Sequence, residues 1–281
     1  MGKLHVPVLL QSACDALEPG PGKRFIDATF GNGGHAKEIS HRGGQVLGID
    51  QDAEVLSPAL TSSLVSPQIQ ITHGNFLYLK DIAKRHDFIP IDGVLFDLGI
   101  SSFQLDNSLR GFSFQVSGPL DMRMDQSQSV TAAYLLNQLP EKDLSGIFSQ
   151  YGEVKHASLV AKKIVSSRPL HTTDQLSGLL SNDHQRRQVF QAIRIAVNAE
   201  LFALETALPQ AFEILKPGGK IVVISFHSLE DRIVKRQFSN WQKSGLGFAP
   251  LSHPIRPNEW EIGSNPRSKS AKLRVFIKKY V

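Results

Sequence analysis

Short apolar runs alternate with amphipathic stretches over the first hundred residues. Four runs rich in Val, Ile, Leu and Phe occupy residues 24–30, 45–50, 69–72 and 91–98. They lack clean polar alternation, which is typical of strands covered on both faces. Helical periodicity falls between them, at residues 35–41, 53–64 and 78–86. Repeated βα units of this length predict an α/β fold with a parallel, doubly wound sheet.

The alternation stops after Gly99. Residues from about 105 to 195 show turn-rich chain and then helical patterns at 131–139, 141–151 and 154–165. We therefore expect a helical insertion over 105–195, on the substrate side of a sheet domain built from 1–104 and 196–281.

The sheet pattern resumes beyond the insertion. A long apolar-periodic helix is expected over 189–215, bent near Pro209. LKPGG then predicts a helix stop and a turn. The run IVVISF at 221–226 predicts a fifth buried strand, followed by a helix at 228–238. Charged and apolar residues alternate over 272–278, as in a strand near a sheet edge.

Charge is uneven along the chain. The net charge is +5, but residues 216–281 hold 13 Lys and Arg against 4 Asp and Glu. A basic end predicts an anionic partner, nucleic acid above all, although a solvated basic surface fits equally well. The single cysteine, Cys14, excludes a disulfide framework. No apolar run approaches the ~18 residues of a membrane span, and no secretory leader is evident, so we expect a cytoplasmic protein.

A glycine loop, Gly31-Asn32-Gly33-Gly34-His35, follows the first predicted strand directly. Glycines let the backbone approach a ligand closely, and the N–H groups at a helix start attract anionic groups. With Ala36 the loop matches a loose dinucleotide fingerprint. A tight strand–helix turn is the alternative.

Two acids end predicted strands of the same sheet. Asp50 closes the second strand, where a carboxylate can accept ribose hydroxyls. Asp97 closes the fourth, at the edge where ligands of open parallel sheets bind, and a buried acid needs a partner. The alternatives are a helix-capping role for Asp50 and a loop-capping role for Asp97.

Longer motifs resemble those of the RsmH (MraW) family, the small-subunit ribosomal RNA cytosine-N4 methyltransferases. They run through the chain in the family order: HVPVLL (5–10), DATFGNGGHA (27–36), DLGISSFQLD (97–106), RGFSF (110–114), GPLDMRMD (118–125), YGE (151–153), FQAIRIAVNAEL (190–201), LKPGGKIVVISFHSLEDRIVK (215–235) and NPRSKSAKLR (265–274). The chain departs from the family pattern at Ala36, at Phe103 and over 184–189. These departures concern RNA contacts and the insertion, not the reaction class.

The resemblance implies a class I methyltransferase, Rossmann-like fold and the cofactor S-adenosyl-L-methionine. It implies a cofactor site made by Gly31, Gly33, Gly34, His35, Asp50, Phe76, Asp97 and Gln104. Asp50 would take the ribose and Phe76 would lie against the adenine. The implied substrate is a cytidine of 16S ribosomal RNA near the decoding centre, in free rRNA or in an assembled 30S subunit.

The cytosine N4 amine is a weak nucleophile, because its lone pair is delocalised into the ring. Asp97 or Asp121 is expected to accept an N–H bond from it or to orient the methionine ammonium of the cofactor, and the sequence does not choose between them. The candidates for binding the RNA are Arg123, Asn198, Ser225, His227, Ser228, Arg267 and Lys269. Arg110, Lys272 and Arg274 are further basic candidates. No metal is expected, since His227 and Glu230 lack further ligands at metal-site spacing.

Two other functions remain open on the sequence. The glycine fingerprint alone fits a dinucleotide-dependent oxidoreductase. A non-catalytic RNA-binding assembly factor would keep the fold without turnover. The oligomeric state is undetermined, with a dimer among the options.

Overall fold

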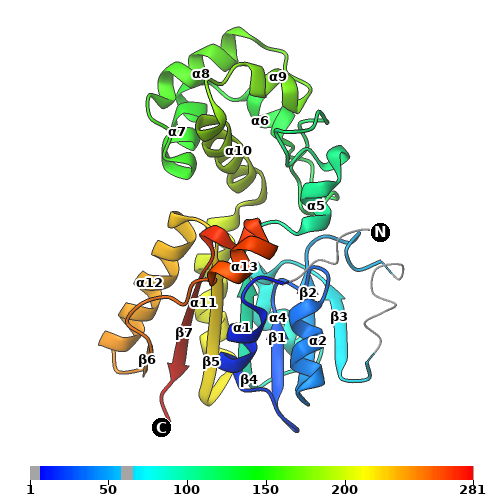
Figure 1. Cartoon of the computed structure of the whole chain (residues 1–281), viewed down its shortest axis with the longest axis vertical. Coiled ribbons are helices and arrows are strands. Elements are labelled where there is room, and N and C mark those ends of the chain that lie inside the picture. Colours follow the sequence, from blue (N-terminus) through cyan, green and yellow to red (C-terminus); the bar gives the residue numbers. More distant parts are fainter. Residues whose placement is uncertain (1–6, 58–65, 281) are drawn as a thin grey trace. The chain divides into compact units, whose positions relative to one another are not determined.

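The computed structural model describes residues 7–57 and 66–280 (Figure 1). The chain divides into two compact units. One, the sheet unit, combines Met1–Gly99 with Leu201–Val281, and the other, the helical unit, is Ile100–Glu200.

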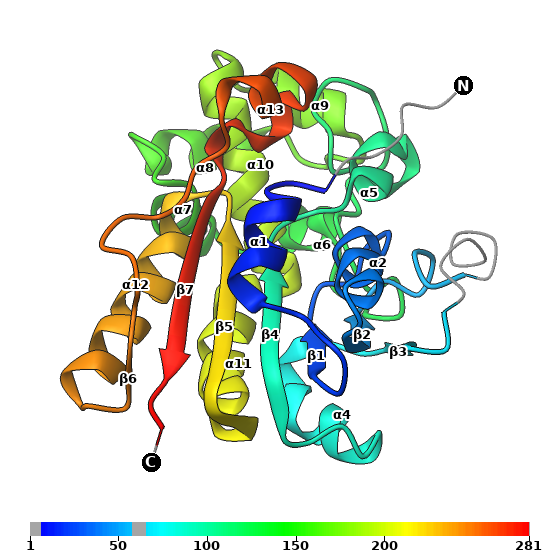
Figure 2. The same cartoon turned by 60° about the horizontal axis from the view of Figure 1, so that its bottom comes forward.

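The sheet unit is built on seven strands. They are β1 (Arg24–Asp27), β2 (Gln45–Asp50), β3 (Ile69–His73), β4 (Ile91–Asp97), β5 (Leu215–Ser225), β6 (Gly247–Phe248) and β7 (Lys272–Lys278). Their order is β3-β2-β1-β4-β5-β7-β6. The first five are mutually parallel, and β7 is antiparallel to both β5 and β6 (Figure 2). The predicted parallel sheet is confirmed, with an antiparallel pair added at one edge.

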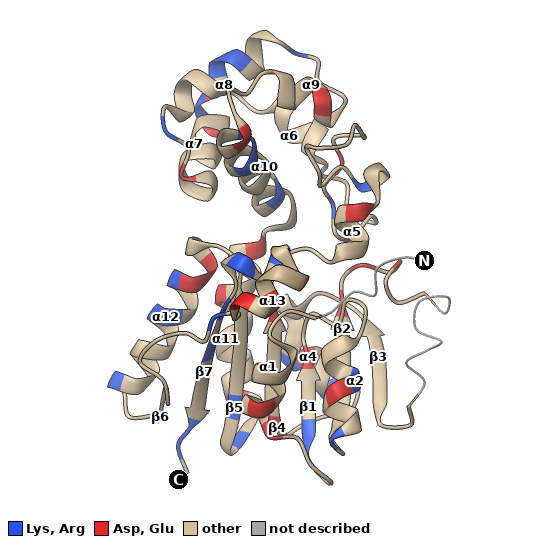
Figure 3. Cartoon of the chain, viewed as in Figure 1, with Lys and Arg blue, Asp and Glu red and all other residues tan. Residues whose placement is uncertain are grey.

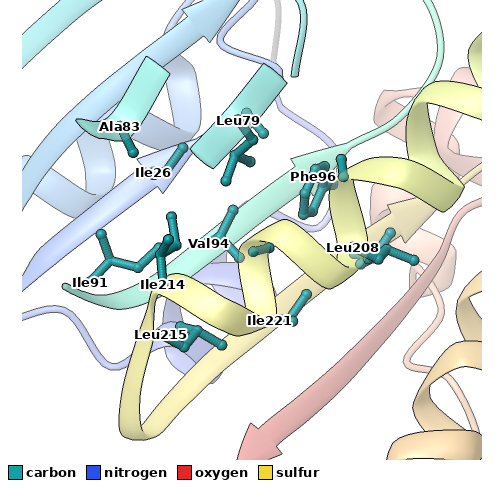
Figure 4. Packing of buried hydrophobic residues seen from close by; sticks show 14 of the residues in the cluster. Ile26, Leu79, Ala83, Ile91, Val94, Phe96, Leu208, Ile214, Leu215 and Ile221 are labelled. Atoms are coloured by element: carbon teal, nitrogen blue, oxygen red, sulfur yellow. The ribbon is translucent and has the colours of Figure 1, made fainter. Parts of the chain in front are cut away.

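Helices cover both faces of this sheet. They are α1 (Leu10–Leu17), α2 (Gly34–His41), α4 (Leu79–Arg85), α11 (Glu200–Ile214) and α12 (Ser228–Lys243). The sheet unit also contains the short helix α13 (Glu259–Ser264) and the 3-10 turns η2 (Phe76–Tyr78) and η4 (Pro266–Ser270). Val94 and Phe96 of β4 pack in the cluster that contains α4 and α11 residues (Figure 4). Leu95 packs in a second cluster with residues of α1 and α2. Because both faces are buried, the strands read as continuous apolar runs.

The helical unit follows β4, as predicted. Its elements are α5 (Ser102–Asp106), η3 (Ser108–Arg110), α6 (Ala132–Gln138), α7 (Glu141–Gly152), α8 (Ala157–Ser166), α9 (Thr173–Gly178) and α10 (Asp183–Asn198). They enclose a separate core, in which Phe148, Leu176 and Val189 are buried.

The prediction of one long helix over 189–215 was wrong. The structure has two helices, α10 and α11, separated at Ala199, which adopts a left-handed φ of 49°. Arg194 bridges this break with two hydrogen bonds to the Glu200 carboxylate, at 2.8 and 3.0 Å. Pro209 lies inside α11 without ending it.

The LKPGG segment does turn the chain, but within the bounds of β5. Ile91 pairs with Leu215 and Gly93 with Lys220, so the intervening residues of β5 bulge out of register. Gly218 there has a φ of +76°, which favours glycine.

Other local predictions had mixed outcomes. Of the helix expected over 53–64, residues 53–57 form turns and the rest lies outside the described residues. The short helices α1, α9 and α13 were not predicted. Within residues 7–57 and 66–280, no helix has both the length and the apolar character needed to cross a membrane.

Candidate functional site

The glycine loop forms the first wall of the candidate site. Gly31 and Gly33 have left-handed φ values of +50° and +71°, and Gly33 is the N-cap of α2. A Cβ on Gly34 would lie 2.2 Å from Cγ of Pro7, so the N-terminal segment packs directly on the loop. His35 Nε2 lies 3.2 Å from the carbonyl oxygen of Val8 in the same segment. The glycines thus permit close approach of the N-terminal segment, and their contact with a ligand stays a prediction.

Asp50, at the end of β2, is bonded to this loop. Its Oδ2 accepts from Gly31 N at 2.7 Å and its Oδ1 accepts from Asp52 N at 2.9 Å. Burial raises the pKa of Asp50 to about 6. Each carboxylate oxygen keeps further acceptor capacity, so ribose hydroxyls can still be bound.

Two acids, Asp27 and Asp97, end the neighbouring strands β1 and β4, and each has one buried carboxylate oxygen. The Asp27 side chain is 1% exposed, and its Oδ2 has no hydrogen-bond partner. Burial raises its pKa to about 7. Oδ1 of Asp97 is likewise buried without a partner. Burial, and then the charges of Asp27 and Glu230, raise the pKa of Asp97 well above its usual range.

Among the described residues, few basic side chains lie near Asp27 and Asp97 to balance the negative charge of their carboxylates. His35 Nδ1 lies 3.7 Å from Asp97 Oδ2, and no Lys or Arg in the described part of the chain forms an ion pair with Asp27 or Asp97. Buried carboxylates are costly unless a positive group joins them. The arrangement therefore suits a ligand that carries positive charge.

The start of α12 supplies a further buried acid. Glu230 is 2% exposed, and its Oε2 accepts from Phe226 N at 2.7 Å and His227 N at 3.2 Å. His227 Nδ1 in turn accepts from Glu230 N at 3.4 Å, which puts the proton of a neutral ring on Nε2. That buried nitrogen makes no hydrogen bond, although Glu230 Oε1 is 3.1 Å away.

Ser225 and Ser228 lie on either side of His227, which is the N-cap residue of α12. Ser225 is buried at the end of β5, and its Oγ donates to Lys272 O at 3.4 Å. Ser228 is the first residue of α12. Since Asp97 is paired with Ile224 in the parallel β4–β5 register, these residues lie at the same sheet edge as Asp97.

Phe76 lies beside β3, an edge strand of the sheet. It follows β3 in η2, and its ring meets that of Phe96 edge to face, with centroids 5.7 Å apart. The strand order then places the predicted side chains along one edge of the sheet, in the sequence Phe76, Asp50, glycine loop, Asp97 and His227.

The remaining predicted residues of the central motifs belong to the helical unit. Gln104 forms a capping box with Ser101, in which its Oε1 accepts from Ser101 N at 3.0 Å. Asp121 and Arg123 form a two-bond ion pair, with distances of 2.8 and 2.7 Å. Although burial opposes it, the Arg123 guanidinium lowers the pKa of Asp121. A carboxylate held in this way is a poor proton acceptor.

Asn198 and Arg110, both in the helical unit, bind backbone atoms of the GPLDMRMD motif (118–125). The Asn198 amide bonds to Met122 O, Met124 N, Arg194 O and Gln128 Nε2, which uses all its donors and both acceptor positions. Arg110 is 1% exposed and donates to the carbonyls of Arg123 and Met124. The expectation that Arg110 contacts RNA was wrong, because its guanidinium is buried.

The basic end of the chain is only partly exposed to a ligand. Arg267 and Lys269 are exposed on η4. Lys272 and Arg274 of β7 instead pair with Asp231 of α12, at 3.0 and 2.7 Å, so they tie a helix to the sheet. Lys and Arg residues occur at several positions along α12 and β7 (Figure 3).

Sequence reasoning missed Asp27 and the burial of Glu230. An acid that ends an apolar strand directly before a glycine loop, as in FIDATFG, was the available signal for Asp27. Nothing local distinguishes Glu230 from an exposed helix-start acid. Among the described residues, no group of three or more His, Cys, Asp and Glu side chains is arranged to hold a metal ion.

Comparison with known proteins gives consistent similarities over nearly the whole chain. Residues 2–279 match the MraW methylase family. "Ribosomal RNA small subunit methyltransferase H" of Thermomicrobium roseum is 44% identical, over 96% of this chain and 92% of the relative. Proteins of the same name from Symbiobacterium thermophilum and Onion yellows phytoplasma are each 42% identical, over 98% of this chain and 96% and 97% of the relatives.

Proposed function

Since the chain belongs to the MraW methylase family, we propose that it transfers a methyl group from S-adenosyl-L-methionine to the N4 amine of a cytidine in small-subunit ribosomal RNA. The observation that carries this proposal is the pair Asp27 and Asp97 beside the glycine loop: each has a buried carboxylate oxygen without a hydrogen-bond partner, and neither has a Lys or Arg partner in the described part of the sheet unit. A dinucleotide would bring an anionic pyrophosphate close to these acids, and like charges repel, so the site is less suited to a dinucleotide.

The residues present fit this cofactor. Its sulfonium and its methionine ammonium are both positive, and the partnerless oxygens of Asp27 and Asp97 are the groups that need positive charge nearby. Gly31, Gly33, Gly34 and His35 would line its chain, Asp50 would accept from the ribose, and Phe76 would contact the adenine.

When bound, the cofactor supplies a methyl group on a good leaving group. The residues of the chain contribute orientation, which can account for up to ~7–11 kcal/mol of the barrier. Of the two candidate acids, Asp97 is the better acceptor for an amine N–H, because Asp121 already holds the Arg123 guanidinium. Accepting that bond lets the amine nitrogen pyramidalise and regain its lone pair.

Other groups would bind the nucleic acid. His227, with a buried Nε2–H, and Ser225 and Ser228 would face the base. Arg267 and Lys269 would contact phosphates. In the helical unit, Arg123 and Asn198 would shape the GPLDMRMD loop for the RNA. We place the reaction in the cytoplasm, on free rRNA or the 30S subunit near the decoding centre.

The test is methyl transfer to small-subunit RNA. Ribosomal 30S subunits and free 16S rRNA from cells lacking this methyltransferase are incubated with labelled cofactor, and the RNA fragments are analysed by mass spectrometry. N4-methylcytidine at one position is expected, lost in Asp97→Asn and retained in Asp121→Asn. Methylation at another atom, or none in either RNA with the cofactor bound, would overturn the proposal.

A further inference from the structure

Trp260 is an unusually exposed tryptophan. Its exposed fraction is 79%, the highest among the large hydrophobic residues of the described chain. Trp241, by contrast, is buried at 8%. Exposed tryptophans are rare because the indole has a large apolar area, and they are enriched where a protein meets a partner.

This exposure occurs on a well-anchored segment. Helix α13, which carries Trp260, is capped by Asn258, whose Oδ1 accepts from Glu261 N at 2.8 Å. The Glu261 carboxylate accepts from Leu9 N at 2.6 Å. On the preceding side, Ile255 and Leu273 exchange two backbone hydrogen bonds of 2.9 Å. The indole is therefore presented by a fixed piece of backbone.

The anchors also place α13 at the cofactor edge of the sheet. Strand β7 is antiparallel to β5, with Lys272 opposite Ser225, so the chain just before Lys272 lies where β5 ends (Figure 2). Leu9, which is bonded to Glu261, follows Val8, whose carbonyl contacts His35 of the glycine loop. Trp260 thus stands on the same edge as the site proposed for methyl transfer.

The chemistry around Trp260 matches single-stranded RNA. Three basic side chains of the segment are exposed, namely Arg256, Arg267 and Lys269, with Glu259 as the exposed acid. Glu261 is committed to Leu9 N. An exposed aromatic ring beside cationic side chains is the usual means of binding unpaired bases, because the ring stacks on a base while the cations hold phosphates.

We propose that Trp260 stacks on an unpaired base of the rRNA substrate next to the target cytidine, with Arg267 and Lys269 holding the adjoining phosphates. The inference rests on the proposed function and deepens it by naming a residue that positions the RNA. A base stacked outside the site would hold the strand open, which the chemistry requires because a cytidine within a helix cannot present its amine.

The experiment compares Trp260→Ala and Trp260→Phe with the control Tyr280→Ala. Tyr280 is 76% exposed, but it lies beside Gly218 at the other end of β5. With saturating cofactor, we expect Trp260→Ala to raise KM for the RNA about tenfold and to change kcat by less than about twofold. Phenylalanine should restore most of the loss, and Tyr280→Ala should behave as wild type. Cofactor affinity should be the same in all four proteins.

A second readout does not depend on turnover. Tryptophan fluorescence of the protein is titrated with a single-stranded oligonucleotide of the target segment and with the same segment in a duplex. Stacking predicts quenching by the single strand, weak quenching by the duplex, and none in Trp260→Ala.

Each contrary outcome is distinct. Equal quenching by both RNAs, or an unchanged KM in Trp260→Ala, overturns the inference while wild-type methylation leaves the proposed function intact. If KM changes only with assembled 30S subunits and free RNA does not quench the fluorescence, Trp260 contacts a ribosomal protein. That outcome also overturns the inference. Quenching by single-stranded RNA without any methylation of rRNA refutes the proposed function and leaves the RNA contact standing.

Discussion

At the scale of single residues, the site is defined by acids that the protein itself leaves unsatisfied. Asp27 Oδ2 and Asp97 Oδ1 are both buried without hydrogen-bond partners. Such atoms lower stability in the ligand-free protein and are retained where a ligand compensates them. Burial raises the pKa of Asp27 to about 7, so this carboxyl titrates within the physiological range.

Asp27→Asn should therefore stabilise the ligand-free protein above neutral pH. The folded pKa lies above the usual 3.8, so the folded state binds more protons, and the aspartate lowers stability increasingly as pH rises from about 4 to 7. We expect the variant to gain on the order of 2 kcal/mol at pH 8 and almost nothing near pH 4. Urea unfolding at several pH values measures this. A gain that does not vary with pH would refute burial of the charge as its cause.

Asp97→Asn should weaken the binding of S-adenosyl-L-methionine by about tenfold or more, since the variant cannot make a charge-assisted hydrogen bond to the cofactor. In the wild type, affinity should rise with pH as the raised pKa values of Asp27 and Asp97 are passed, because only the ionised carboxylates attract the cation. Calorimetric titration of the variant should show a flatter pH dependence. Asp121→Asn is the matched control, expected to bind as wild type.

At the scale of elements, the junction between α10 and α11 shows how a loop is held. Ala199 leaves the helical conformation with a φ of 49°, and the preceding Asn198 binds the backbone of Met122 and Met124. The break thus lets a helix end hold the GPLDMRMD loop, whose Asp121 and Arg123 side chains pair with each other. A continuous helix through Ala199 would lose the Arg194–Glu200 bridge across the break.

Ala199→Gly should stabilise the protein by about 1 kcal/mol, because glycine adopts left-handed φ values without the steric cost of a Cβ. The same substitution at Ala196, within α10, should destabilise it by about 1 kcal/mol. Denaturant unfolding of both variants measures whether the free energy of unfolding rises in Ala199→Gly and falls in Ala196→Gly. Destabilisation by Ala199→Gly would contradict the left-handed assignment.

At the scale of the whole molecule, the chain forms two units with separate cores, and each unit carries different parts of the predicted function. The sheet unit carries the glycine loop, the acids and the basic end, and the helical unit is inserted directly after the strand that ends in Asp97. All of the net positive charge lies beyond residue 215, where 13 Lys and Arg face 4 Asp and Glu, but Asp231 neutralises part of it by pairing with Lys272 and Arg274. Arg267 and Lys269, both exposed on η4, are the residues of this region that we expect to contact phosphate.

Replacing Arg267 or Lys269 by alanine should weaken RNA binding and reduce the slope of log Kd against log salt by about 1 for each phosphate that is no longer neutralised. Cofactor affinity should not change. Lys243→Ala, at the far end of α12, is the control and should keep the wild-type slope. Unchanged slopes in the Arg267 and Lys269 variants would remove these residues from the RNA interface.

The sequence by itself determined the parallel sheet, the insertion after β4, the glycine loop and the positions of Asp50 and Asp97 at strand ends. These features are local, since runs of apolar residues reflect burial and a motif specifies its own turn. Only the tertiary structure decided which polar groups have partners. It buried Arg110 and Glu230, engaged the Asn198 amide fully, paired Asp121 with Arg123, left Asp27 and Asp97 unsatisfied, and broke the helix at Ala199. Each depends on atoms contributed by more than one element, and neither periodicity nor spacing carries that information.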